Sequence, residues 1–254
     1  MKITFLGTGT SQGIPVIACK CIVCQSTDKK DKRYRSSVLI ELDGKNLVID
    51  TGPDFRSQML ENQVEHLDAL LFTHEHKDHI AGLDDVRPFN FKQGTSIPIY
   101  CSSQVEKAIK REYHYIFADQ KYPGIPELEL HIIENESFQI FNNQKIIPIE
   151  VNHYLMKVFG FRINDFTYIT DAKTIDQSEI SKIQGTKTLV VNALRHESHI
   201  SHFSLQEALE LIDFIKPENA YLTHISHLFG THKKMEIDLP ENVFFAYDGL
   251  QLIV

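Results

Sequence analysis

The sequence predicts an α/β fold, and two observations lead to it. Short apolar runs typical of buried strands alternate with helix-like segments along the 254 residues. Several of these runs end directly in histidine or aspartate, and open α/β sheets keep their functional residues at strand ends. The hydrophobic content of 42% and the charged content of 24% are ordinary for a globular protein. The length allows one large domain or two small ones.

The first strands are short and joined by recognisable turns. Residues 3–6 form an apolar run that ends in Gly7-Thr8-Gly9-Thr10. This is not a Walker loop, because no Gly-Lys-Ser/Thr follows, and the frequency of glycine in turns favours a tight turn over a phosphate cradle. Residues 37–42 and 46–50 form a hairpin around Asp43-Gly44. Asp50, at the end of that hairpin, could cap a helix over 53–62 or orient a metal-bound histidine, and the two roles are compatible.

A dense group of metal-type side chains follows the next strand, Leu70 to Phe72. The segment Thr73 to His79 contains His74, His76, Asp78 and His79. Imidazole and carboxylate are ligands that zinc and similar divalent ions prefer. The spacing does not line one helical face, so these side chains must fan out from a turn. Such a turn can hold two ions side by side.

Cysteine use indicates a second kind of metal site. Cys19, Cys21 and Cys24 can occupy three corners of a tetrahedral structural zinc. From the residues alone, Cys101 and the remaining histidines are candidates for the fourth corner. Three unliganded thiols on a loop are the alternative, although close cysteines in a reducing compartment usually bind a metal.

The rest of the chain continues the pattern of strands that end in metal-type residues. We expect a helix to open near 80–83, and the strand ends at His153, Asp171 and His224 stand out. The helix over 204–214 has Ser204 as its cap and Glu207 completing a capping box. The further strands are expected at 97–101, 128–133, 137–141, 144–151, 159–163, 166–170, 188–191, 219–222, 243–245 and 250–254, and a further helix at 103–117.

Charge and hydropathy restrict the location and the partners. No apolar run approaches the ~20 residues that span a membrane, and the first residues lack the features of a signal peptide. We therefore expect a cytoplasmic protein with no membrane partner. The formal net charge of −8 argues against a nucleic-acid surface, although a small phosphorylated substrate held by bound metal still fits. The oligomeric state is not decided by the sequence, and a homodimer stays open.

His74-x-His76-x-Asp78-His79, with His153, Asp171 and His224 at later strand ends, resembles the metallo-β-lactamase superfamily. The resemblance covers the whole chain. It implies a single domain over residues 1–254, folded as a four-layer αβ/βα sandwich with two mixed β-sheets. It also implies that His74, His76 and His153 hold one zinc or manganese ion, that Asp78, His79 and His224 hold a second, and that Asp171 bridges both.

The opening Gly7-Thr8-Gly9-Thr10-Ser11, the Cys19-x-Cys21-x-x-Cys24 loop and the ending Thr223 to His227 are together similar to the PhnP-like phosphodiesterase branch. That resemblance implies that His227 completes the structural zinc in place of Cys101. It also matches His202 with a histidine that serves as general acid. His196 and His199 are close enough in sequence to leave this assignment open.

The expected activity is therefore hydrolysis of a small phosphodiester, cyclic and phosphoribosyl forms included. The implied nucleophile is a hydroxide bridging two metal ions, since coordination lowers the pKa of water to about 7 in favourable sites. Asp78, as a metal ligand, and His202, as a proton donor, are the predicted catalytic residues. Zinc, manganese or iron would suit the ligands.

Three rival functions use the same residues differently. A thioester or lactone hydrolase would keep the two-metal site and attack a carbonyl carbon. A transfer-RNA-processing nuclease is disfavoured by the acidic balance and by the lack of a Lys/Arg-rich arm. A non-catalytic protein of cofactor biosynthesis would keep the structural zinc and lose the two-metal set, whereas every expected ligand is present here.

Overall fold

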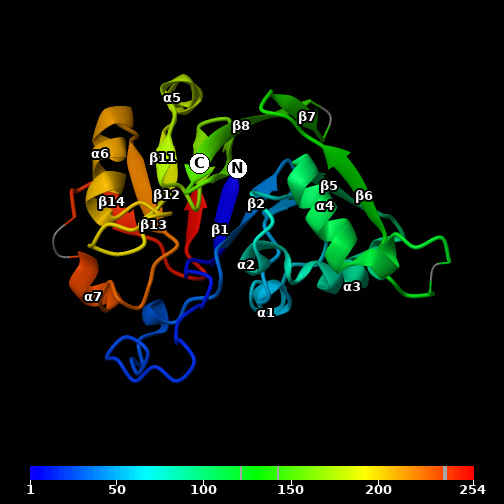
Figure 1. Cartoon of the computed structure of the whole chain (residues 1–254), viewed down its shortest axis with the longest axis horizontal. Coiled ribbons are helices and arrows are strands. Elements are labelled where there is room, and N and C mark those ends of the chain that lie inside the picture. The colour runs from blue at the N-terminus through cyan, green and yellow to red at the C-terminus, as the bar shows by residue number, and fades with distance from the viewer. Residues whose placement is uncertain (121, 142, 237–238) are drawn as a thin grey trace.

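The computed structural model describes residues 1–254 except 121, 142 and 237–238, and it contains two mixed β-sheets (Figure 1). In the described residues the first sheet has seven strands in the order β15-β1-β2-β3-β4-β5-β6. Their bounds are β1 Lys2–Gly7, β2 Ser37–Leu42, β3 Lys45–Ile49, β4 Ala69–Leu71, β5 Ile97–Cys101, β6 Leu128–Ile132 and β15 Gln251–Ile253. Strand pairs from β15 to β3 are antiparallel, and those from β3 to β6 are parallel.

The second sheet repeats this plan. Over the same described part of the chain it has eight strands, in the order β11-β8-β9-β10-β12-β13-β14 with β7 paired to β8. Their bounds are β7 Phe138–Ile140, β8 Gln144–His153, β9 Met156–Ile163, β10 Phe166–Ile169, β11 Thr174–Ile175, β12 Thr188–Asn192, β13 Asn219–Thr223 and β14 Val243–Phe245. Pairs from β11 to β10 are antiparallel and those from β10 to β14 are parallel, so both sheets are mixed, as predicted, and are built on the same plan.

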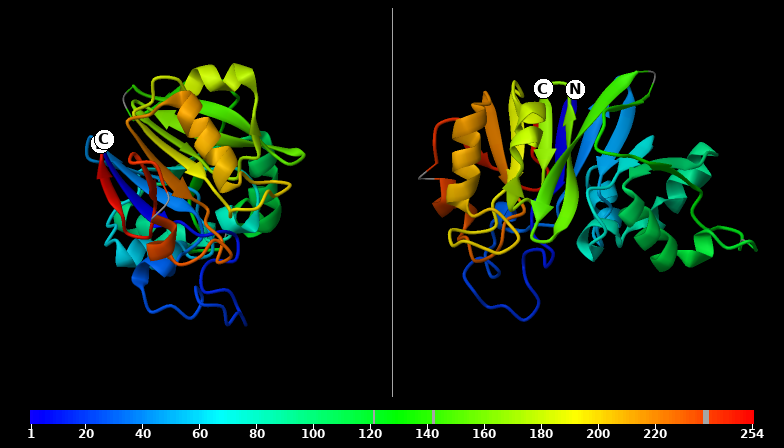
Figure 2. Two further views of the ribbon diagram at one scale, coloured as in Figure 1. Left: turned by 90° about the vertical axis from the view of Figure 1, so that its left-hand side faces the viewer. Right: turned by 45° about the horizontal axis from the view of Figure 1, so that its top comes forward.

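Helices cover the outer face of each sheet (Figures 1 and 2). The helices are α1 Phe55–Glu61, α2 Lys77–Ile80, α3 Arg87–Gln93, α4 Ser103–Glu112, α5 Gln177–Ile183, α6 Leu205–Ile215 and α7 His232–Met235, with short 3-10 turns at Lys29–Asp31, Leu83–Val86 and His114–Ile116. One core cluster joins α1, α3 and α4 to the first sheet, and another joins α5 and α6 to the second. Helix, sheet, sheet and helix thus form the predicted four layers.

Alternating side chains explain why both faces of each sheet are buried. On β3, Leu47 and Ile49 point into the core between the sheets, whereas Val48 points to the outer helices. On β12, Val190 faces the central core and its two neighbours face the helices. Because successive strand residues point to opposite faces, near-continuous apolar runs are what a sheet in the middle of a sandwich requires.

The structure differs from the sequence-based elements in a few places. The helix expected near residues 80–83 is instead a single turn, α2, that ends at Ile80. The helix does not continue because Gly82 donates its N–H to Thr51 O at 2.8 Å, outside the helix. Glycine suits this position because a Cβ on Gly82 would overlap Gly52 O. The helix expected to reach residue 117 ends at Glu112. In the described part of the chain, no helix is long and apolar enough to cross a bilayer.

The central core gives the first prediction. Phe161 is fully buried between the sheets, so Phe161→Ala should lower the free energy of unfolding by about 3–5 kcal/mol through lost burial and a cavity. Phe214→Ala is the matched control, because Phe214 is 56% exposed on α6 and its removal should change stability by less than about 1 kcal/mol. Urea unfolding of both variants measures the difference, and equal losses would contradict this account of the core.

Candidate metal centre

The predicted ligands gather at one edge of the two sheets. The segment with His74, His76, Asp78 and His79 follows β4, and His153 ends β8. Asp171 comes two residues after β10, and His224 comes directly after β13. Parallel strands bring their carboxyl ends to the same edge, so β10 and β13, both next to β12, deliver their following residues side by side.

The first group consists of His74, His76 and His153. Their ligand nitrogen atoms all lie within 4.8 Å of one another. His74 Nε2 lies 3.1 Å from His76 Nδ1, and the ring of His153 is centred 5.2 Å from that of His76. Three imidazoles converging from two different sheets suit one ion with a further open position.

The second group centres on His79 and Asp171. With His74 they form a further set whose ligand atoms lie within 4.8 Å. His79 Nε2 is 3.2 Å from Asp78 Oδ2 and 3.3 Å from Asp171 Oδ2. This buried nitrogen has no hydrogen-bond partner in the described residues, which fits a position that a metal ion would satisfy.

The last predicted ligand, His224, also meets Asp171. Its Nδ1 is 3.4 Å from Asp171 Oδ2, and its ring stacks on that of His79 with centroids 6.1 Å apart. Ser36 Oγ lies 3.1 Å from the same Nδ1 of His224. The Ser36 hydroxyl donates its hydrogen to Gly9 O, so its oxygen can accept the hydrogen bond from the His224 N–H. His224 is therefore placed beside Asp171, although it and Asp78 stand slightly outside the tightest groups.

Asp50 supports the site from behind. Its carboxylate lies 2.7 Å from His79 Nδ1 and accepts hydrogen bonds from the backbone N–H and the hydroxyl of Thr73 at 2.9 and 2.8 Å. The helix-cap role considered for Asp50 is wrong, because Asp54 occupies the N-cap of α1. Asp50 instead orients His79, so that Nε2 faces Asp78 and Asp171.

Buried carboxylates dominate the electrostatics. Burial alone would lower the pKa of His79, but Asp78, Asp171 and Asp50 outweigh it and raise that pKa well above its ordinary value. Burial likewise opposes ionisation of Asp171, yet His224 and His79 hold its pKa well below the usual range. The same carboxylates that favour a proton on His79 would favour a divalent ion, which would take the place of that proton.

His202 lies closest to the ligands among the three candidate acids. Its ring centroid is 4.7 Å from that of His153 and 4.8 Å from that of His224, on which it stacks. His199 stacks behind His202 at 5.2 Å, whereas His196 packs against Phe229. Burial and the nearby His224 lower the pKa of His202 to about 3, so its imidazole is neutral at pH 7.

His202 has a second possible role. Its Nδ1 is buried without a hydrogen-bond partner in the described residues, and it lies 3.7 Å from Asp171 Oδ1. The ligand atoms of His153, Asp171 and His202 also lie within 4.8 Å of one another. The geometry therefore allows His202 either to contact a substrate or to bind an ion.

The cysteine loop meets His227 as a fourfold group. His227 Nδ1 lies 3.4 Å from Cys19 Sγ, 3.4 Å from Cys21 Sγ and 3.6 Å from Cys24 Sγ. Tetrahedral zinc with ordinary bond lengths places nitrogen and sulfur ligands about 3.5 Å apart, so the four atoms fit such an ion. Cys101, the other candidate, is buried in the core under the outer helices and is not part of this group.

Some supporting residues were not predicted from the sequence. Ser36 and Thr73 contact ligand imidazoles, and Ser201 O lies 2.9 Å from His153 Nδ1. Hydroxyl and carbonyl groups occur throughout any sequence, so no local pattern distinguishes those that reach a histidine. Only the tertiary fold identifies them.

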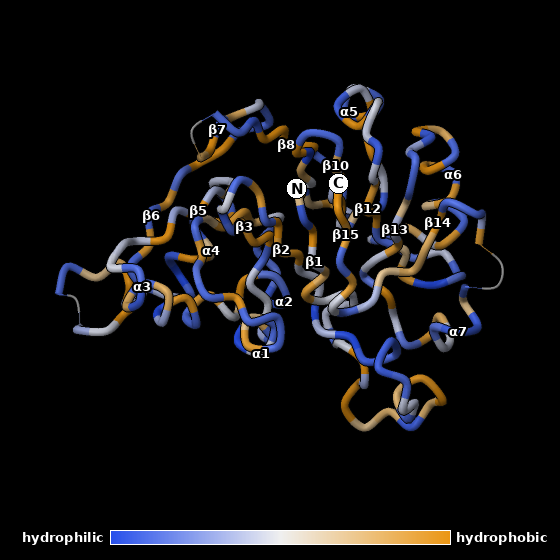
Figure 3. Tube along the Cα trace, turned by 180° about the vertical axis from the view of Figure 1, so that it is seen from behind, coloured by the Kyte–Doolittle hydropathy of each residue, from blue (hydrophilic) through white to orange (hydrophobic). Residues whose placement is uncertain are grey.

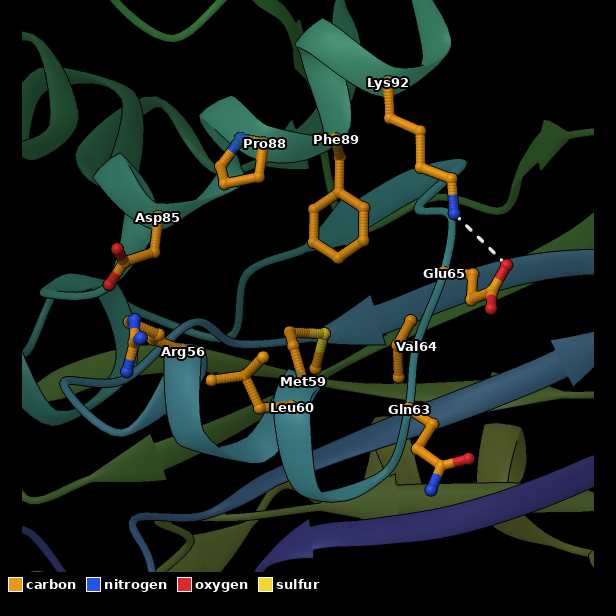
Figure 4. A pocket seen from close by; sticks show the side chains of 10 residues that line it. All are labelled: Arg56, Met59, Leu60, Gln63, Val64, Glu65, Asp85, Pro88, Phe89 and Lys92. Carbon is orange, nitrogen blue, oxygen red and sulfur yellow. Dashed lines mark hydrogen bonds and ion pairs between the residues drawn. The ribbon is translucent and has the colours of Figure 1, made fainter.

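A cavity of about 620 Å³ lies elsewhere, between α1 and α3 on the outer helical layer (Figure 4). Met59, Leu60, Val64 and Phe89 supply its apolar lining, and Lys92 pairs with Glu65 at its rim. None of the predicted ligands lines it. We therefore place the candidate functional site at the histidine cluster, where the chemically active side chains converge.

Comparisons with known proteins agree with this architecture. The beta-lactamase superfamily domain matches residues 45–225. A solved structure described as a new diphosphatase from the PhnP family is 37% identical, covers 100% of this chain and 97% of that chain, and superposes with a TM-score of 0.93. Zinc-bound PqqB from Methylobacterium extorquens is 17% identical over the whole of both chains, with a TM-score of 0.80, and shares the fold.

A longer relative adds a different name. The octanoyltransferase of Porphyromonas gingivalis is 36% identical over 257 residues, a match that covers 100% of this chain and 52% of that protein. This chain thus spans about half the length of that relative.

The contact behind His79 gives a prediction. Asp50→Asn removes the charge that fixes His79, and we expect about 10- to 100-fold weaker metal binding at the histidine cluster. Asp43→Asn makes the same chemical change in an exposed hairpin turn and should leave binding unchanged. Chelator competition followed by elemental analysis measures both, and unchanged retention in Asp50→Asn would refute the supporting role.

The group of Cys19, Cys21, Cys24 and His227 gives a further prediction. Cys24→Ser should lose one zinc ion per chain and lower the melting temperature, because thiolate binding to zinc contributes to folding. Cys101→Ser is the control: Cys101 is buried but lies in a different core, so that variant should keep its zinc content. Zinc counted by elemental analysis decides, and loss of zinc from Cys101→Ser would contradict the assignment to His227.

Proposed function

The chain belongs to the metallo-β-lactamase superfamily, as a PhnP-like member, and from this premise we propose that it is a metal-dependent phosphodiesterase acting on a small linear or cyclic diester. One observation supports this most strongly: a buried carboxylate, Asp171, lies between two imidazole groups and beside His202, where it could be shared by two ions. The likeness to a PhnP-family diphosphatase supports a phosphorus centre as the site of attack.

The residues divide into those that would bind the metal ions and those that orient the metal-binding side chains. His74, His76 and His153 would hold one divalent ion, and Asp78, His79 and His224 the other, with Asp171 shared. When bound, two such ions supply a water nucleophile active at neutral pH and offset the negative charge of the phosphoryl group. Asp50 and Ser36 keep two of the imidazoles in position from behind.

His202 would act at the leaving oxygen. A neutral imidazole has one N–H, which can donate a hydrogen bond to an ester oxygen that faces it. A negatively charged phosphoryl group nearby favours the imidazolium and raises the pKa of His202 from its low starting value. His202 could then pass a proton to the leaving alkoxide, and this matters most when the leaving group is a poor one.

A thioester hydrolase is the second candidate. The name of the Porphyromonas gingivalis relative, an octanoyltransferase, favours an acyl substrate. Because this chain matches about half of that protein, the relative's name does not assign the acyl chemistry to the matching half, and octanoyl thioesters belong in the same assay. The metal ligands would keep their places, while His202 would matter less because a thiolate leaves without protonation.

The test combines metal content with turnover. Elemental analysis of the purified chain should give three metal ions, and bis(p-nitrophenyl) phosphate should be hydrolysed faster than an octanoyl thioester or a lactone. Three metals with thioesterase activity alone would support the second candidate. One metal and no turnover after addition of zinc or manganese would overturn both hydrolase proposals.

Replacing His202 separates its two possible roles. His202→Ala should keep its metal content and lose about 10²- to 10⁴-fold in rate on an alkyl leaving group, with a much smaller loss on p-nitrophenol. His196→Ala, a histidine that packs against Phe229, should keep both rates. If His202→Ala loses a metal ion, or slows both substrates equally, the general-acid role is wrong.

A further inference from the structure

Two exposed apolar elements stand next to the metal centre. One is the turn between β8 and β9, where Tyr154 is 55% exposed and Leu155 is 85% exposed. The other is Ile200, 62% exposed on the loop that leads to α6. Single exposed apolar side chains are normal on protein surfaces, but a group of them beside a functional site is informative.

The β8–β9 turn has an unusual composition for its geometry. His153 pairs with Met156, so Tyr154 and Leu155 form a two-residue hairpin turn, and Tyr154 has a left-handed φ of 57°. Such turns favour Gly, Asn and Asp. This chain uses those residues in two other hairpins, Asp43-Gly44 and Asn164-Asp165. Tyr154 thus combines exposure with a strained backbone, and strained positions are concentrated at functional sites.

Both elements approach the site through the same histidine. Tyr154 directly follows His153, and Ser201, the neighbour of Ile200, places its carbonyl oxygen 2.9 Å from His153 Nδ1. The right-hand view of Figure 2 shows the β8–β9 hairpin and the loop before α6 at the same end of the molecule. The backbones of the two segments therefore meet at His153, whose ring is centred 4.7 Å from that of His202.

We propose that Tyr154, Leu155 and Ile200 form an apolar wall that binds an alkyl or aryl substituent of the substrate next to the bond that is cleaved. The inference rests on the proposed function, because it places that substituent on a phosphodiester at the same site. Its physical basis is the removal of apolar surface from water on both partners. A ribosyl group, with its hydroxyls, would gain little from this wall.

Binding of alkylphosphonates tests the wall without requiring turnover. Calorimetry on the metal-loaded chain should show affinity rising about twofold per methylene from methylphosphonate to hexylphosphonate, a fraction of the gain for complete burial. In the double variant Leu155→Ser/Ile200→Ser, the ratio of the affinity for hexylphosphonate to that for methylphosphonate should fall toward one. Phe214→Ser removes a side chain of similar exposure from α6 and should keep the wild-type ratio.

Three results would overturn the proposal: equal affinities for the two phosphonates in the wild type, no binding of hexylphosphonate, or an unchanged ratio in the double variant. A dimer that becomes monomeric on Leu155→Ser, seen by light scattering, would also overturn it, since the wall would then be an interface between copies. Hydrolysis of bis(p-nitrophenyl) phosphate is measured separately, so failure of the phosphodiesterase proposal is distinguishable from failure of the wall.

Discussion

The contact between His79 and Asp171 is the constraint on which the rest of the structure depends. His79 comes from the first sheet and Asp171 from the second, and they meet with His79 Nε2 3.3 Å from Asp171 Oδ2. Isolating such groups from water is costly unless they are paired or bind a metal. Burial of the large apolar core between the sheets offsets the free-energy cost of isolating these groups from water, and it holds the two halves together behind the site. Binding of cations is therefore linked to the stability of the fold.

Backbone conformation shows how the strands aim these side chains. Asp50, Asp171 and His224 follow strands and have left-handed φ values of 65°, 58° and 57°. Such values are uncommon for residues other than glycine and are found where the surrounding structure compensates for strain. At each position the change in direction turns a side chain from the pleated sheet toward the space between the halves. The strain is thus part of how the cluster is assembled.

Much of the fold could be predicted because its signals are local. Apolar runs with β-branched residues mark most strands, and Ser204 with Glu207 marks the start of α6. Asp43-Gly44 marks its hairpin for the same reason. By contrast, β11 has only two residues, Thr174 and Ile175, and is held by pairing to β8, so no pattern in the sequence reveals it.

The site divides in the same way. Histidines at strand ends are visible in the sequence, and parallel pairing then brings them together. The role of Asp50 was ambiguous because a helix cap and a support for a histidine place an aspartate at the same position in a sequence. The hairpin turn at Tyr154 was missed because the usual turn residues are absent there. A residue that violates a local rule becomes informative only when the structure shows what surrounds it.

This division between core and edge also bears on specificity. The predicted ligands lie at strand ends and are held by buried partners such as Asp50, so substitutions there are expected to change metal binding before they change substrate choice. Tyr154, Leu155 and Ile200 lie on turns, with solvent on one side and a ligand histidine on the other. Such positions can change without disturbing the core. Proteins that share the same set of metal ligands can therefore differ in substrate through these loops alone. For this reason the fold and the ligand set do not determine which molecule is cleaved.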